Sequence, residues 1–284
     1  MSVQHINQKP TVIFMHIPKA AGSTLHGILE RQYPKSGIYD IDTSRLHESI
    51  DEFKQLERDK KLNILLLKGH IPFGLHEYLP QQSRYLTMLR DPVNRVISHY
   101  NYAARRQDHY LHETIIKNKM SLKDYVSSGI SHEIDNAQVR LLSGHDDDLP
   151  IGSCDALLLE QAKHNLATWF DVIGIVERFD ESVLLMREKL NWRWSPIYVS
   201  RKVRKHKTPN KEMSQELRAS ILKYNELDFK LYAFANTLFD QSIREYSEKI
   251  AHKLKRFQAI NSIYGTVART GIDVRKSIKR VVNY

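Results

Sequence analysis

The chain has 284 residues, a formal net charge of +10 and a single cysteine. This length accommodates one large domain, or one domain with an appendage, and a hydrophobic fraction of 41% is sufficient for a substantial core. The single cysteine excludes an internal disulfide framework and is typical of a reducing compartment. The positive charge favours acidic ligands without identifying them.

The sequence shows no segment of the kind that inserts into membranes. Residues 1–10 are polar and lack the hydrophobic region of a signal peptide. The longest aliphatic run, residues 64–67, is far shorter than the ~20 apolar residues that a membrane span needs. We therefore expect a cytoplasmic protein.

The first predicted elements are a strand, a tight loop and a helix. An apolar, β-branched run over residues 11–17 predicts the strand, and residues 23–33 show the helical pattern. Between them lies His-Ile-Pro-Lys-Ala-Ala-Gly-Ser-Thr-Leu, residues 16–25. A helix that follows a strand in this way presents backbone N–H groups and a positive dipole end to a phosphate. The lysine precedes the glycine, so the order differs from the Gly-x-x-x-x-Gly-Lys-Ser/Thr loop of nucleoside-triphosphate-binding proteins.

A second strand-to-helix segment follows about seventy residues later. Residues 84–89 predict a strand that ends at Arg90, and Asp91-Pro92 predicts the start of a helix, because proline suits the first helical turn. Ser98 lies eight residues after Arg90. An arginine at a strand end can bind a phosphate through two parallel hydrogen bonds. This segment is therefore a second candidate phosphate site.

Further apolar runs at residues 63–68, 156–159 and 171–176 predict three more strands, and the intervening segments show helical spacing. This alternation predicts an α/β fold, in which a parallel β-sheet is flanked by helices on both faces. Ligands of such sheets bind beyond the carboxyl ends of the strands, where both candidate phosphate segments lie. Residues 143–153, with three consecutive aspartates, predict a loop.

Together these segments resemble the sulfotransferases that use 3′-phosphoadenosine 5′-phosphosulfate (PAPS). Residues 16–25 resemble the 5′-phosphosulfate loop of that family, and residues 90–100 resemble its 3′-phosphate motif. The resemblance continues in three later segments, residues 136–144, 172–180 and 225–232, and covers about residues 11–239. Within that family, the chain most resembles the branch of carbohydrate 2-O-sulfotransferases and their soluble bacterial relatives.

The resemblance implies an activity: transfer of a sulfuryl group from PAPS to a hydroxyl of an acceptor, a glycan or a glycolipid, leaving 3′-phosphoadenosine 5′-phosphate (PAP). It implies that Lys19 stabilises the leaving oxygen and that Arg90 and Ser98 bind the 3′-phosphate. The residues implied in donor binding are Lys19, Ala20, Ala21, Gly22, Ser23, Thr24, Arg90, Ser98, Ser200 and Arg204. Ser23 could instead serve only as a helix N-cap. The basic run at residues 200–207 could instead be a solvated loop without a role in binding.

The resemblance also assigns the general base. In the carbohydrate branch a histidine after the strand at residues 63–68 takes the acceptor proton, which implies His70. A histidine with an unperturbed pKa of ~6.5 suits this task. The alternative for His70 is a hydrogen bond within a turn. His76 is a weaker rival as the base, whereas His16 and His99 are assigned to packing or ligand contacts.

Two other classes of function compete with this interpretation. A kinase-like phosphotransferase would need a lysine directly before the serine or threonine and a magnesium-binding acid, and Lys19 stands elsewhere. A non-catalytic binder would hold an acidic polymer or a membrane through its basic tail. Sulfuryl transfer rests on positioning and charge stabilisation, and the sulfuryl group carries less charge than a phosphoryl group. We therefore expect no metal, and no nucleic-acid partner.

Several residues could have either a functional or a structural role. Three polar residues either line the acceptor site or brace a buried helix: Asn136, Gln138 and Arg140. Four aromatic residues are expected in the core rather than as platforms for sugars: Trp169, Phe170, Trp192 and Trp194.

The last segment, residues 241–284, is predicted to be a unit apart from a sulfotransferase domain at residues 1–240. Ten basic and three acidic residues give it a net charge of +7. Apolar residues recur at three- and four-residue spacing, which predicts an amphipathic helix that ends near Gly271: Ile243, Tyr246, Ile250, Leu254 and Phe257. Such a helix suits a homodimer contact, an anionic surface or packing back on the core.

Overall fold

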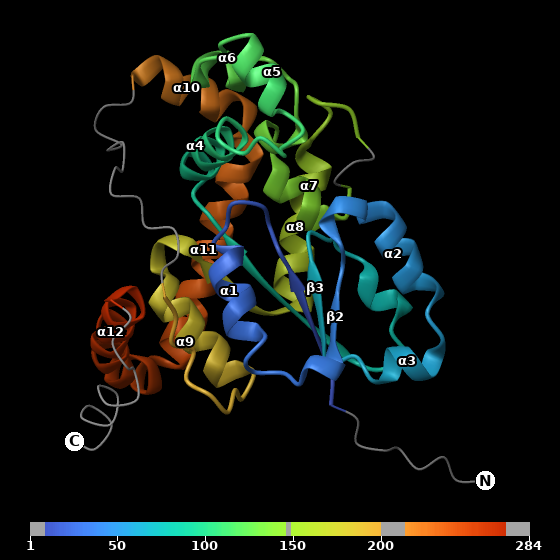
Figure 1. Ribbon diagram of the computed structural model, residues 1–284, viewed down its shortest axis with the longest axis vertical. Helices are drawn as coiled ribbons and strands as arrows, with labels where there is room; N and C mark the ends of the chain where they lie inside the picture. Colours follow the sequence, from blue (N-terminus) through green and yellow to red (C-terminus); the bar gives the residue numbers. More distant parts are fainter. Residues whose placement is uncertain (1–8, 146–148, 200–213, 271–284) are drawn as a thin grey trace.

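The computed structural model describes residues 9–145, 149–199 and 214–270, with the backbone alone for residues 268–270. Its centre is a five-stranded sheet in the order β2-β3-β1-β4-β5, in which every pair of neighbours is parallel (Figure 1). The strands are β1 Thr11–Met15, β2 Ile38–Asp40, β3 Leu66–Gly69, β4 Ser83–Leu89 and β5 Phe170–Ile175. The predicted parallel α/β fold is confirmed.

Helices and short 3-10 turns connect and cover the strands. The α-helices are α1 Gly22–Leu29, α2 Leu46–Gln55, α3 Arg58–Leu62, α4 Pro92–Ala103, α5 His112–Lys117, α6 Leu122–Ser127, α7 Ala137–Ser143, α8 Ala156–Trp169, α9 Phe179–Lys189, α10 Gln215–Tyr224, α11 Glu226–Glu245 and α12 Ser247–Thr270. The 3-10 turns are η1 Lys35–Gly37, η2 Thr43–Arg45, η3 Leu75–Tyr78, η4 His132–Ile134 and η5 Val176–Arg178.

The central strand β1 is buried along its whole length, because β3 and β4 flank it and helices cover the sheet. Its sequence is an almost unbroken apolar run, which is the pattern of a parallel strand covered on both faces. The pairing places Met15, the last residue of β1, beside Gly69 of β3 and Thr87 of β4. The chain segments that leave these three strands therefore emerge next to one another.

A helical lobe stands over the carboxyl ends of the strands. Figure 1 shows α4, α5, α6 and α10 gathered at the top of the molecule, above the sheet. This lobe, which we call the upper lobe, has an apolar cluster of its own that includes Val96, Leu111, Ile115, Tyr125 and Ile221. The space between the sheet and the upper lobe is where a parallel sheet binds its ligands.

One predicted strand is wrong and one strand was not predicted. Residues 156–159 form the first turn of α8, because the Asp155 carboxylate caps this helix by accepting a hydrogen bond from Leu158 N at 3.0 Å. Alanine and leucine are also strong helix formers. The edge strand β2 has three residues, too few for an alternating or continuous apolar pattern to stand out.

The aromatic residues expected in the core divide into two pairs. Phe170 and Trp192 are buried, as predicted. Trp169 and Trp194 have exposed fractions of 41% and 55%, so the prediction is wrong for them. Trp169 is the last residue of α8, where the helix ends before β5 and its side chain meets solvent.

The last two helices, α11 and α12, pack against the rest of the protein. The predicted boundary after residue 240 lies inside α11, and the break between helices falls at Tyr246. In Figure 1, α12 lies beside α9. Of the predicted apolar stripe, Ile250 and Phe257 are buried in the core, and the other three members pack half-buried against it: Ile243, Tyr246 and Leu254. Gly271, the predicted end of the helix, lies outside the described residues. None of the described helices is both long and apolar enough to cross a membrane.

Candidate active site

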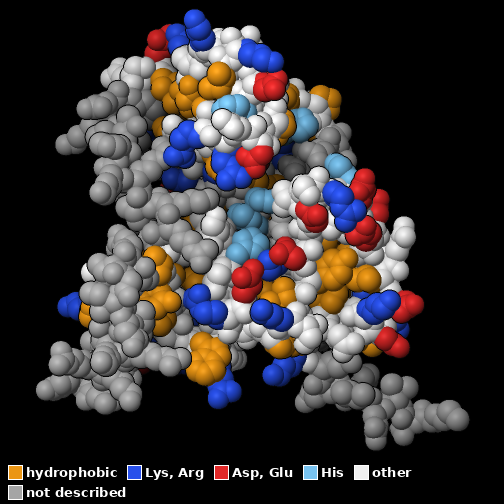
Figure 2. Space-filling view, viewed as in Figure 1, with side chains coloured by type: hydrophobic (Ala, Val, Ile, Leu, Met, Phe, Trp, Pro, Cys, Tyr) orange, Lys and Arg blue, Asp and Glu red, His pale blue; other side chains and the backbone are white. Residues whose placement is uncertain are grey.

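The predicted site residues emerge from three neighbouring strands. His16 follows β1, His70 follows β3, and Arg90 follows β4, with β1 between the other two. Figure 2 shows histidine side chains in a hollow between the upper lobe and the lower part of the molecule, with acidic and basic side chains nearby. The strand order therefore brings together residues that the sequence separates by more than fifty positions.

The loop between β1 and α1 has a strained backbone. Lys19 and Ala21 adopt positive φ angles of 66° and 60°, which are uncommon for residues other than glycine. Ala21 is the N-cap of α1, and no side chain caps this helix. The interpretation of Ser23 as the N-cap is wrong, because Ser23 is the second residue of the helix.

Two backbone amides of the predicted phosphate loop already donate within it. Ala20 N–H donates to the carbonyl of Ile17 at 3.2 Å, and Thr24 N–H donates to that of Ala21 at 3.1 Å. A phosphate at the start of α1 would therefore not rely on the amides of Ala20 and Thr24, which lie at the two ends of the predicted loop.

Gly22 has a steric reason to be glycine. A Cβ atom on Gly22 would lie 1.7 Å from His16 Nε2, so the absence of a side chain lets the His16 ring pack against the start of α1. His16 in turn contacts two other histidines. Its ring stacks on His70 with centroids 4.0 Å apart, and its Nδ1 lies 3.1 Å from His26 Nε2. The three rings form a compact group at the ends of β1 and β3.

The hydrogen bonding of His70 defines its tautomer. His70 Nδ1 lies 2.9 Å from the backbone carbonyl of His16. A carbonyl oxygen can only accept, so Nδ1 carries the proton and Nε2 of the neutral ring keeps its lone pair. Burial lowers the pKa of His70 below its ordinary value, partly opposed by the charge of Glu133. His70 is therefore neutral at pH 7 and able to accept a proton at Nε2.

Burial also keeps the two other histidines of this group neutral. It lowers the pKa of His26 to about 4, an effect that the charge of Lys68 reinforces. It lowers the pKa of His16 well below the ordinary value, and protonation of the neighbouring His70 would lower it further. Lys68 itself forms ion pairs with Asp40 and, at 3.2 Å, with Glu30.

Lys19 connects the two candidate phosphate segments. Its carbonyl accepts a hydrogen bond of 2.8 Å from Arg90 Nη1, and its ammonium lies 3.5 Å from the centroid of the Tyr102 ring. A cation over an aromatic face at this distance is attracted by the ring quadrupole. Sequence reasoning missed Tyr102, although it lies one helical turn after Ser98 on α4 and so shares its face.

The start of α4 is built as predicted. The Asp91 carboxylate caps the helix by accepting a hydrogen bond from Asn94 N at 2.9 Å, and Pro92 is its first residue. Ser98 lies half-buried two turns into the helix. Ser200 and Arg204, the remaining predicted donor ligands, lie outside the described residues.

Arg90 is held by a side chain from another helix. Gln138 Oε1 accepts the Arg90 backbone N–H at 3.0 Å, and Gln138 Nε2 donates to the Arg90 carbonyl at 3.0 Å. Arg140 is also fully buried and bonds to Asp135 and to the backbone of Leu149. These contacts support bracing, rather than acceptor binding, as the role of Gln138 and Arg140.

A half-buried carboxylate on η4 influences the site through its charge. Glu133 accepts a hydrogen bond of 2.6 Å from Arg95, whose side chain is fully buried. Burial acts to raise the pKa of Glu133, but the charges of His99 and Arg95 hold it below its ordinary value. His99 is 3% exposed and bonds through Nδ1 to Tyr125 OH at 2.6 Å, which agrees with a packing role. No motif in the sequence marks Glu133.

The rival base lies at the opposite end of the sheet. His76 Nδ1 lies 3.1 Å from the hydroxyl of Tyr85, near the start of β4, and its ring packs on Trp169. His76 and Trp169, with Ser83 and Pro10, line a cavity of about 660 Å³ at the amino ends of the strands. Arg90 lies five residues after Tyr85, about 16 Å along an extended chain. The suggestion that His76 is a rival base is therefore wrong.

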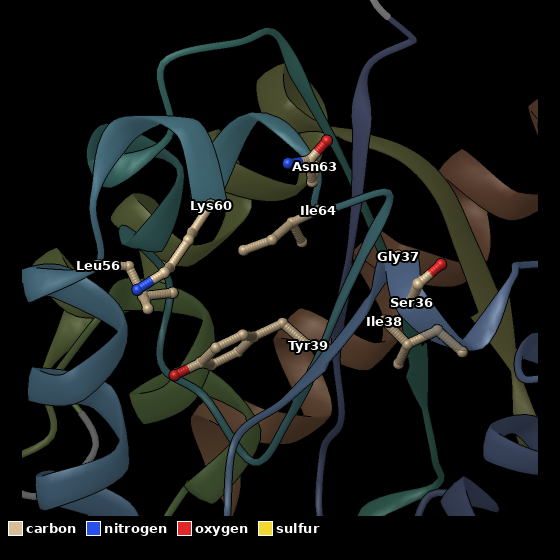
Figure 3. Close-up of a pocket in the computed structure, with 8 residues that line it drawn as sticks. All are labelled: Ser36, Gly37, Ile38, Tyr39, Leu56, Lys60, Asn63 and Ile64. Atoms are coloured by element: carbon tan, nitrogen blue, oxygen red, sulfur yellow. The ribbon is translucent and has the colours of Figure 1, made fainter.

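A second cavity is also remote from the histidines. It has a volume of about 290 Å³ and lies beside β2 and α3, where the Tyr39 side chain points toward Leu56 and Lys60 (Figure 3). Among the described residues, no group of three or more His, Cys, Asp or Glu side chains is arranged to hold a metal ion.

Comparison with known proteins identifies the family. Residues 5–235 match the model of the sulfotransferase family. The chain belongs to this family. It is 24% identical over 262 residues to heparan sulfate 2-O-sulfotransferase 1 of Xenopus laevis, a match that covers 83% of this chain and 72% of the relative. The proteins of the same name from Gallus gallus and Homo sapiens are each 24% identical over 266 residues, with the same coverage.

These matches confirm that the protein is a sulfotransferase and that its relatives act on a carbohydrate. The family match ends at residue 235, within α11, so α12 lies beyond it.

Proposed function

We propose that this sulfotransferase transfers a sulfuryl group from PAPS to a hydroxyl of a carbohydrate, with His70 as the general base. One observation carries the proposal. The three neighbouring strands β3, β1 and β4 end in His70, the Lys19 loop and Arg90, and hydrogen bonds join each end to the middle one. A base, a cation for the leaving group and a phosphate-binding arginine thus face one hollow.

The residues present fit PAPS as the donor. The uncapped start of α1 suits a 5′-phosphate, which we assign to the amides of Ala21 and Gly22 and the hydroxyls of Ser23 and Thr24. Arg90 and Ser98 would hold the 3′-phosphate. PAPS, when bound, supplies the sulfuryl group and leaves as PAP. The absence of a side chain on Gly22 leaves room for the His16 ring beside this end of α1.

Two side chains carry the chemical step. The Lys19 ammonium supplies positive charge beside the bridging oxygen, where negative charge develops as the bond to sulfur breaks. His70 takes the acceptor proton at Nε2, since its Nδ1 proton is committed to the His16 carbonyl. That same hydrogen bond persists in the imidazolium and helps to hold the ring at a fixed angle.

The acceptor class follows from the relatives. The matched proteins are named for heparan sulfate and for transfer to a 2-O position. We propose a carbohydrate hydroxyl as the acceptor here, with desulfated heparan sulfate as the first polymer to test.

Nucleotide binding tests the donor site directly. Calorimetry with PAP and with AMP should show that PAP binds at least tenfold more tightly, because charge-assisted hydrogen bonds to the 3′-phosphate contribute ~1.5–3 kcal/mol each. Arg90→Ala should remove most of this preference. Radiolabelled PAPS should then transfer its label to the polymer. Equal affinity for PAP and AMP, or phosphoryl transfer from ATP, would overturn the proposal.

A further inference from the structure

We infer that Gln138 is a positioning residue of the donor site, which holds Arg90 and, through Arg90, the Lys19 loop. The inference rests on the proposed role of Arg90 in binding the 3′-phosphate. Gln138 does not face the donor itself, since its side chain is fully buried. Its role is to fix the backbone from which the Arg90 side chain extends.

The amide of Gln138 completes the end of β4. The strand ends at Leu89, so Arg90 is the first residue whose backbone groups no longer take part in the sheet ladder. Gln138 supplies both missing partners at 3.0 Å, an acceptor for the Arg90 N–H and a donor for its carbonyl. Buried backbone groups without partners are costly. A side chain with both a donor and an acceptor in one plane is required here.

Gln138 is itself held rigidly. The Asp228 carboxylate, at the start of α11, accepts the backbone N–H groups of Gln138 at 3.2 Å and Val139 at 2.9 Å. In return, Asn136 Oδ1 accepts the N–H groups of Leu227 and Asp228 at 2.9 and 3.1 Å. Helices α7 and α11 thus cap each other's first turns. This reciprocal cap sets the position of the Gln138 side chain.

The same connection continues into the Lys19 loop. Arg90 Nη1 donates to the carbonyl of Lys19, the residue whose φ is 66°. A series of hydrogen bonds therefore runs from Asp228 through Gln138 and Arg90 to Lys19. Because small displacements of binding groups cost large factors in rate, moving Arg90 would disturb both proposed phosphate contacts.

The test compares the preference for PAP over AMP, measured by calorimetry, in wild type and variants. Gln138→Leu keeps the approximate volume and removes both hydrogen bonds to Arg90. We expect the PAP preference to fall about tenfold, and kcat/KM for PAPS to fall with it. Gln138→Glu keeps the hydrogen-bond acceptor and loses the donor, and it replaces the leucine variant if that variant does not fold. We expect its preference for PAP over AMP to fall as well.

Asn165→Leu is the matched control. Asn165 is 1% exposed and its Nδ2 donates to the carbonyl of Leu142 at 2.8 Å, at the other end of α7. Its loss should lower the melting temperature in the same way as the loss of Gln138 but leave the PAP preference unchanged. In an Arg90→Ala background, Gln138→Leu should cause no further loss of preference, since it acts through the Arg90 side chain.

The outcomes separate the two proposals. A wild-type protein without PAP preference overturns the proposed function and this inference together. A wild-type protein that prefers PAP, with the full preference retained in Gln138→Leu or Gln138→Glu, overturns the inference alone. An equal loss of preference in Asn165→Leu also overturns it, because general loosening of α7 would then be the cause.

Discussion

Acidification from pH 7 to pH 5 should destabilise the folded protein, because burial lowers the pKa of several of its histidines. Burial, as the main cause, lowers the pKa of His26 and of His99 to about 4, whereas an unfolded histidine titrates near ~6.5. Between these values the unfolded state binds more protons than the folded state. The free energy of unfolding therefore falls as the pH drops through ~6.5, and the loss is complete below about 4.

The size of the effect follows from the two pKa values. At pH 5 an unfolded histidine is almost fully protonated and a buried one is mostly neutral, so each contributes a loss of ~2 kcal/mol relative to pH 7. Both together remove ~4 kcal/mol, a large part of the 5–15 kcal/mol that stabilises a typical domain. Around His99, the charge of Glu133 raises its pKa, while Arg95, His109 and Lys19 lower it.

Urea unfolding at pH 7, 6 and 5, followed by circular dichroism, measures this loss. The variant His99→Gln can still bond to the Tyr125 hydroxyl but cannot titrate, so its loss of stability between pH 7 and 5 should be smaller than that of the wild type by ~2 kcal/mol. His47→Gln, on the exposed face of α2, serves as the control for a histidine-to-glutamine substitution at the surface. If His99→Gln loses as much stability between pH 7 and 5 as the wild type does, the reasoning is wrong.

Three further outcomes follow from the site and the tail. In steady-state kinetics His70→Ala should lower turnover by a factor of ~10²–10⁴ with donor affinity nearly unchanged, whereas Lys19→Ala should lower both turnover and donor affinity. The wild-type rate should fall only below about pH 6.5, since burial lowers the pKa of His70. Activity should survive EDTA, because Lys19 and the start of α1 supply the positive charge; a loss restored by magnesium would contradict this. Removing residues 247–284 should cost ~3–6 kcal/mol in urea unfolding, since Ile250 and Phe257 are buried; an equally stable truncated protein would contradict the packing of α12.

Local patterns predicted the elements that carry the site. The apolar runs before His16 and Arg90 are strands, and the Asp91-Pro92 pair starts a helix. Residues 156–159 show the limit of this reasoning. A short apolar run suits a buried strand or a helix equally well, and the Asp155 cap decides for the helix.

The spatial order of the strands could not be predicted from such local patterns. Alternation of strands and helices predicts a parallel sheet, but it does not say that β1 lies between β3 and β4. That order decides which residues share the site, because it places His70 and Arg90 on the two sides of the Lys19 loop. His76, six residues after His70, lies instead at the amino ends of the strands.

The remaining features depend on contacts between distant residues. Gln138 lies 48 positions from Arg90, and Asp228 lies 90 positions from Gln138, so no local pattern pairs them. The positive φ angles of Lys19 and Ala21 likewise cost ~1–3 kcal/mol each and persist only where surrounding structure imposes them. The motif supplies the chemical groups of the site, and the packing of α7 and α11 supplies the rigidity with which Arg90 and Lys19 are held. A protein with the motif but without this packing would have the right residues in an imprecise arrangement.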